Sequence, residues 1–396
     1  MARISTLIPP DASPAEAPRD ASGGSLSFRQ RLERIDWPPL ALAFVALLWL
    51  VWLGRDMTFY HDEWALILKR DLSINGIFAP HNEHLSATLV VLYRVLIGTV
   101  GLGSYWPYLG VTFALHLIVA GLVYVIVRRE TSAGWALGAM AVMLVLGSGG
   151  DDILWAFQSA TIGAMAAGIG AMVVAPRRPC LAAVLLTVSV ATSGASLAFL
   201  AGTGVHLLLT RPRALPWLLV PAGLYFAWYV TIGHSGIAAL RSPSLDGVPE
   251  YVAVGLAASA AGALGSTVQA VGLVACVAVA VGLVVFRPIP PIVIALLAAG
   301  VAFFVIAGTV RAELGSEQAT APRYVYIVAP VFIVAGAVLL ARVPRPLGLR
   351  IAEVALIFAF IGNVVLLLAA HDRLVSKIEC ERSMTPLARG SAGNPC

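Results

Sequence analysis

Long apolar stretches recur along almost the whole chain, and short turns of arginine, proline or a few acidic residues separate them. A helix needs about 20 mostly apolar residues to cross the roughly 30 Å hydrocarbon core of a bilayer. An outer-membrane barrel would instead show short segments of alternating polarity. The pattern therefore predicts an all-α, polytopic membrane protein.

Eleven of the apolar runs are suited to cross the membrane. These predicted spans cover residues 38–54, 105–127, 132–148, 158–175, 180–192, 195–210, 214–233, 268–286, 291–309, 325–342 and 350–370. Spans 180–192 and 195–210 are short and are joined at Thr192-Ser193-Gly194, which predicts a hairpin of half-length helices. Non-helical backbone at membrane depth is tolerated where it is buried in protein or lines a cavity.

Two further apolar segments are expected not to cross. Residues 85–101 are apolar enough to span, but Arg94 lies in the middle and a crossing would invert every later loop. We expect an amphipathic helix that lies on the outer face. Residues 250–266 are expected to form an interfacial or re-entrant segment. The pattern leaves open whether either segment crosses.

Composition and charge agree with a membrane location and predict an orientation. Hydrophobic residues make up 59% of the chain and charged residues 12%, and the mean hydropathy is +0.88. The net charge of +5 comes largely from arginines at the ends of apolar runs. Such arginines favour the cytoplasmic side, so we expect a plasma-membrane protein with a cytoplasmic N-terminus and an extracytoplasmic C-terminus. We expect contact with membrane lipid and none with nucleic acid, and the oligomeric state stays open.

The polar ends of the chain define its expected domains. Residues 1–36 have no apolar run and are expected to be a disordered cytoplasmic tail. Residues 37–370 form the membrane domain, with a first outer loop over 55–104, and residues 371–396 form a short extracytoplasmic tail. Cys380 and Cys396 lie in that tail, where a disulfide is compatible with an oxidising compartment but is not established by two cysteines.

The first outer loop carries the clearest candidate chemistry. It contains Tyr60-His61-Asp62-Glu63-Trp64 and, further on, His81-Asn82-Glu83-His84. Charged groups at a bilayer are costly and often have a function. A carboxylate can accept a proton from an incoming hydroxyl, and an arginine can hold a phosphate by paired hydrogen bonds. A lipid-phosphate substrate would use both groups while its tail stays in the membrane.

The outer loops together supply the candidate site residues. Besides Asp62 and Glu63, the candidates for substrate or phosphate binding are His61, His81, Glu83, His84, Arg94, Asp151, Asp152, Gln158, Arg323 and Tyr324. The spacing from His81 to His84 is not the His-Glu-x-x-His zinc signature. Mg²⁺ or Mn²⁺ would suit oxygen-rich ligands. A divalent cation therefore stays open as a cofactor, with Asp62, Glu83 and His84 as its candidate ligands.

The order of elements in the first third of the chain is distinctive. An apolar span precedes an Asp-Glu pair, an acidic residue opens an amphipathic helix ending at glycine, and a second long span leads to arginines. This order resembles the GT-C membrane glycosyltransferases, the clan of protein O-mannosyltransferases and aminoarabinose transferases. The match covers roughly residues 38–130 and is only topological beyond them.

The resemblance implies a fold, an activity and residue roles. It implies a GT-C-like fold and transfer of a sugar from a polyprenyl-phosphate donor to a glycan, lipid or protein acceptor on the outer face. It further implies Asp62 as the catalytic base with Glu63 beside it. Glu83 would organise the acceptor, a metal or the phosphate, and Arg323-Tyr324 would suit the carrier phosphate.

Two other functions stay open. Where many GT-C enzymes have Lys-Pro-Pro-Leu after the glutamate, this chain has His84-Leu85-Ser86-Ala87. One alternative is a transporter or flippase for a lipid-linked or small polar substrate, and the other is a non-catalytic relative of the GT-C enzymes.

Overall fold

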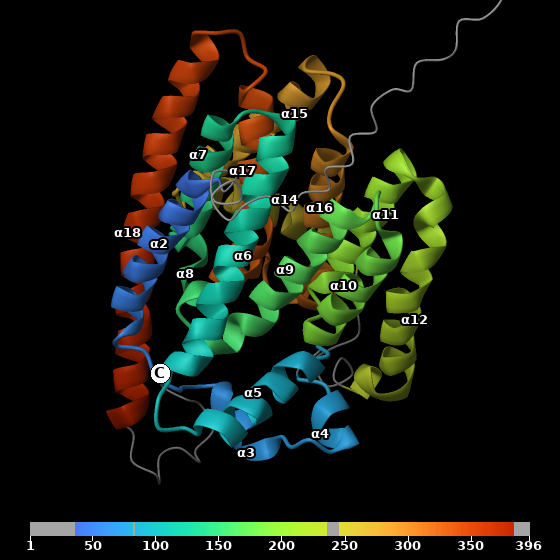
Figure 1. The fold of residues 1–396 in the computed structure, drawn as a ribbon, viewed down its shortest axis with the longest axis vertical. Coiled ribbons are helices and arrows are strands. Elements are labelled where there is room, and N and C mark those ends of the chain that lie inside the picture. The colour runs from blue at the N-terminus through green and yellow to red at the C-terminus, as the bar shows by residue number, and fades with distance from the viewer. Residues whose placement is uncertain (1–35, 82–83, 236–244, 384–396) are drawn as a thin grey trace, which may run out of the picture. The chain divides into compact units, whose positions relative to one another are not determined.

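Helices make up the regular structure in the part of the chain described by the computed structural model, residues 36–81, 84–235 and 245–383 (Figure 1). All but the first two of these residues belong to the compact unit Pro38–Cys396. The N-terminal tail expected over residues 1–36 lies outside the described residues except for Asp36.

Within the described residues, eight helical segments are long and apolar enough to cross a bilayer. They are α2 (Trp37–Gly54), α6 (Trp106–Glu130), α7 (Ala133–Leu144) with η1 (Gly147–Gly149) and α8 (Gly150–Ile153), η2 (Ala156–Gln158) with α9 (Ser159–Val174), η3 (Pro212–Leu218) with α12 (Leu219–Trp228) and η4 (Tyr229–Gly233), α16 (Pro291–Arg311) with η5 (Ala312–Leu314), α17 (Pro322–Leu340), and α18 (Leu347–Ser383). Each coincides with a predicted span. These helices therefore support the prediction of a polytopic, helical membrane protein.

The three remaining predicted spans also coincide with helices, but these are shorter. They are α10 (Pro179–Thr192), α11 (Ser196–Thr210) and α15 (Gln269–Val285). Helices α10 and α11 are packed against each other and are joined by residues 193–195, as the hairpin prediction requires. The count of eleven crossings, the orientation of the termini and the GT-C fold stay predictions.

In its described residues, the first loop forms three short helices gathered at one end of the long ones (Figure 1). They are α3 (Glu63–Lys69), α4 (Ile74–Phe78) and α5 (Ala87–Val100). Helix α5 ends at Gly101, whose φ of 68° suits a residue without a Cβ. From α5, Arg94 donates hydrogen bonds to the carbonyls of Leu66 and Ile67 at 2.6 and 2.8 Å. This arginine therefore joins α5 to α3.

Helix α14 (Val248–Ala263) occupies the segment predicted to be interfacial or re-entrant. It packs against α15, α16 and α17, and its small residues allow close approach of neighbouring helices. A Cβ on Gly255 would lie 2.3 Å from the Phe304 ring, and one on Gly262 would lie 2.5 Å from Val325. This burial does not fit a helix lying on the membrane surface, and the re-entrant and crossing alternatives stay open. The short helix η6 (Ser316–Thr320) and helix α17 also pack beside α14.

Helix α18 is longer than the span predicted over 350–370. It has 37 residues and ends at Ser383, so the expected tail over 371–396 begins as helix. Its buried residues recur every three or four positions, at Asn363, Leu367, Ala370, Leu374 and Ile378. This apolar stripe continues into the charged segment and keeps it packed on the core. The end of α18 carries Cys380, and Cys396 lies outside the described residues.

Candidate functional site

A cavity of about 740 Å³ lies between the first loop and helices α8 to α12 and α16 to α18. Its polar wall includes His61, Asp62, His81, His84, Asp151, Gln158, Arg311, Arg323, Lys377 and Glu381, together with hydroxyl side chains such as Ser193 and Tyr324. Its apolar and aromatic wall includes Leu197, Ala198, Tyr225, Phe226, Phe303, Ile306, Ala307, Val310 and Ile327. The cavity therefore combines charged groups with a wide hydrophobic surface.

A tight turn presents Asp62 to this cavity. The backbone N–H of Glu63 donates to the carbonyl of Tyr60 at 3.3 Å, which closes the turn directly before α3. His61, between them, has a φ of 53°. The Asp62 carboxylate is about one-third exposed (37%) and lies 3.7 Å from the ring of His61. Asp62 is therefore accessible to a ligand in the cavity.

Glu63, the next residue, is fully buried. Its carboxylate accepts hydrogen bonds from the hydroxyls of Tyr93 and Tyr105, from the indole N–H of Trp155, and from the backbone N–H of Tyr60. Burial raises the pKa of Glu63 to about 7, although the hydrogen bonds lower it in part. Burial also raises the pKa of Tyr93 and Tyr105, with the Glu63 charge adding to the effect. Glu63 does not line the cavity. The sequence prediction had given it a catalytic role beside Asp62, whereas in the structure only Asp62 of the two reaches the cavity.

The two histidines of the second motif line the cavity, and His84 lies close to the link between α10 and α11. The backbones of His81 and His84 exchange two hydrogen bonds of 3.0 Å, and both residues line the cavity. A Cβ on Gly194 would lie 2.6 Å from Nδ1 of His84, so the link between α10 and α11 approaches this ring closely. Glu83 lies outside the described residues.

Two cations in the cavity wall form no ion pair with any described residue. Arg323, at the start of α17, lies over the ring of Tyr324 at 5.2 Å. Lys377 comes from the end of α18. The sequence predictions included Arg323 and Tyr324 but missed Lys377 and Glu381, which were assigned to a tail. The spacing of Leu374 and Ile378 was the signal that could have identified this part of α18 as helix.

The remaining predicted residues divide between the cavity and its surroundings. Asp151 lines the cavity and pairs with Arg373 at 3.2 Å. Gln158 lines it too and accepts a hydrogen bond from Thr161 at 2.8 Å. Arg94 and Asp152 do not line it. Asp152 is fully buried, and neither of its carboxylate oxygens has a hydrogen-bond partner among the described residues.

The described residues do not assemble a metal centre. No three histidine, cysteine, aspartate or glutamate side chains within them are grouped to hold an ion. Of the candidate ligands, Asp62 and His84 both line the cavity. Because Glu83 lies outside the described residues, a Mg²⁺ or Mn²⁺ site stays a prediction.

Comparisons with protein-family models, with curated proteins and with solved structures found no match for this chain.

Proposed function

We propose that the protein transfers a sugar from a polyprenyl-phosphate donor to an acceptor on the outer face of the membrane. One observation carries the proposal. An accessible carboxylate, Asp62, shares a cavity with two cations, Arg323 and Lys377, that have no described ion-pair partner, and with a broad apolar wall.

The apolar wall suits a lipid that stays in the membrane. Phe226 and Ile306 line the cavity and are also 67% and 38% exposed on the helices. With a membrane around these helices, the two side chains would connect the cavity to the hydrocarbon region. A polyprenyl chain can occupy this side while its phosphate reaches the cations.

The polar wall suits the chemistry of sugar transfer. Arg323 and Lys377 would bind the phosphate of the donor by charge-assisted hydrogen bonds. Asp62 would take the proton of an acceptor hydroxyl as its oxygen forms a bond to the anomeric carbon of the sugar. The bond between that carbon and the phosphate oxygen breaks, and its electron pair leaves with the phosphate. The products are a glycosylated acceptor, a polyprenyl phosphate and a protonated Asp62 that releases its proton to water.

Sugar transfer by purified protein in lipid vesicles tests the proposal. A panel of radiolabelled polyprenyl-phosphate sugars is offered with crude membrane acceptors to the wild type and to Asp62→Asn. We expect label in an acceptor with the wild type and at least a hundred-fold less with the variant, since a positioned base contributes about 10² to 10⁴ in rate. Asp71→Asn is the matched control, because Asp71 is an exposed carboxylate of the same loop that does not line the cavity. Equal transfer by Asp62→Asn and the wild type would refute the role of Asp62.

Asp152 favours a second candidate function, a transporter or flippase. It lies in the candidate span Ala133–Ile153, where the helix is interrupted after Leu144. Ionisable residues within spans mark transport pathways, and transporters place them at interrupted helices. Movement of a lipid-linked sugar across vesicles without covalent change, and its loss in Asp152→Asn, would support transport over sugar transfer.

A further inference from the structure

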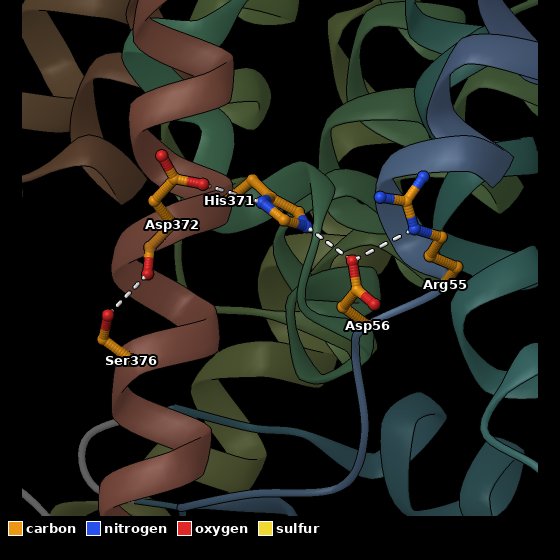
Figure 2. A network of polar contacts seen from close by, with 5 residues as sticks. All are labelled: Arg55, Asp56, His371, Asp372 and Ser376. Atoms are coloured by element: carbon orange, nitrogen blue, oxygen red, sulfur yellow. Dashed lines mark hydrogen bonds and ion pairs between the residues drawn. The ribbon is translucent and has the colours of Figure 1, made fainter.

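The charged end of α18 contacts the first loop and the cavity at several points. The ring of His371 lies between Asp372 and Asp56, with its Nε2 3.3 Å from the Asp56 carboxylate (Figure 2). Arg373 pairs with Asp151. Near the end of the helix, the carboxylate of Glu381 accepts a hydrogen bond of 3.0 Å from the backbone N–H of His61.

Buried side chains hold this part of α18 in place. Leu374 and Ile378 are 1% and 2% exposed and belong to the main hydrophobic core. Glu381 follows Ile378 by three residues, close to one helical turn. Its carboxylate is therefore presented to the first loop from a packed helix rather than from an exposed tail.

The hydrogen bond from His61 to Glu381 matters because His61 has an unfavourable backbone conformation. Its φ of 53° lies in the left-handed region, which is unfavourable for a residue with a Cβ. Among the described residues other than glycine, no other has a positive φ. Such a conformation persists only where its surroundings hold it. Here the N–H of His61 points to Glu381, while its carbonyl accepts from Trp64 at 3.2 Å in the first turn of α3.

We infer that Glu381 is a positioning residue for Asp62: it holds the peptide of His61 in the left-handed turn that directs Asp62 into the cavity. The hydrogen bond joins residues 320 positions apart, so the last helix sets the geometry of the first loop. Glu381 acts through His61 and is not itself the base. This inference rests on the proposed role of Asp62, but the hydrogen bond can be tested without sugar transfer.

Hydrogen exchange at the His61 amide tests the contact directly. Residue-resolved exchange is measured by mass spectrometry on the full-length protein in detergent micelles for the wild type, Glu381→Ala and Glu381→Gln. We expect the alanine variant to exchange at least ten-fold faster at His61, and the glutamine variant to keep most of the protection because its amide oxygen also accepts. Glu379→Ala is the matched control, since Glu379 is an exposed glutamate of the same helix that does not line the cavity. Unchanged exchange at His61 in Glu381→Ala would overturn the inference.

A double-mutant cycle separates positioning from general loss of structure. Glycine adopts a left-handed φ without the Cβ penalty, so His61→Gly should make the turn less dependent on Glu381. With the donor that the wild type uses, we expect Glu381→Ala to lower kcat at least ten-fold with little change in KM, and to have a several-fold smaller effect in the His61→Gly background. An equal effect of Glu381→Ala in both backgrounds would refute positioning through His61. If the wild type transfers no sugar at all, the proposed function fails, and the exchange experiment still decides the role of Glu381.

Discussion

Replacing Glu63 by glutamine should change how the stability of the protein depends on pH. Burial raises the pKa of this carboxyl from an ordinary value of 4.5 to about 7, so the folded state binds the proton more tightly than the unfolded state does. The stability that comes from this proton is fully present below pH 4.5 and is lost as the pH rises through about 7. Because one pKa unit corresponds to about 1.4 kcal/mol, the loss is about 3 kcal/mol. Glutamine cannot ionise, so Glu63→Gln removes this pH dependence.

The free energy of unfolding in mixed micelles measures the effect. Sodium dodecyl sulfate is titrated into detergent-solubilised wild type and Glu63→Gln at pH 4.5 to 8, and tryptophan fluorescence reports unfolding. We expect the stability of the variant relative to the wild type to rise by about 3 kcal/mol over this range. A constant offset is also expected, because glutamine has one acceptor oxygen for the donors of Tyr93, Tyr105 and Trp155. Parallel pH profiles for the two proteins would refute a raised pKa at Glu63.

Three further substitutions test separate parts of the structure. Gly194→Val should lower donor binding at least several-fold without unfolding the protein, because its Cβ would lie 2.6 Å from the His84 ring; donor binding equal to that of the wild type would contradict this contact. Asp152→Leu should raise the free energy of unfolding by about 1–3 kcal/mol, since it removes a buried carboxylate with no described hydrogen-bond partner. A melting temperature below that of the wild type would contradict the view that this carboxylate destabilises the fold. Ile378→Ala should cost about 2–5 kcal/mol because this side chain is 2% exposed, whereas a change of the size seen for exposed Arg382→Ala would show that the end of α18 is not packed.

The helices that sequence periodicity and composition could predict are those whose signals are local. Each predicted span coincides with a helix because a long apolar run has one favourable conformation in a bilayer. Gly101 ends α5 where a glycine was expected to end it. The polar link Thr192-Ser193-Gly194 separates α10 from α11 for the same kind of local reason.

The parts that sequence could not predict depend on contacts between distant segments. The environment of Glu63 is built from Tyr93, Tyr105 and Trp155, which lie 30 to 92 positions away. In the sequence, aromatic residues near span ends are explained equally well by an interfacial belt. The resemblance singled out Asp62 as the base, but nothing in the sequence indicated that Glu63 beside it is buried; only packing distinguishes the exposed carboxylate from the buried one. The end of α18 was missed for a different reason, because its charges obscured the buried stripe that Leu374 and Ile378 continue.

The predicted crossing of the membrane by the short helices α10 and α11 would have a consequence for the lipid around them. With 14 and 15 residues, these helices are about 21 and 23 Å long, whereas the hydrocarbon core is about 30 Å thick. Such hydrophobic mismatch is relieved by local thinning of the bilayer or by tilting of neighbouring elements. Because the residues that join the two helices line the cavity, the thinned patch would lie beside the cavity. Lipid head groups there would lie several ångströms deeper than elsewhere. In membranes with longer acyl chains, the free-energy cost of this thinning would be higher.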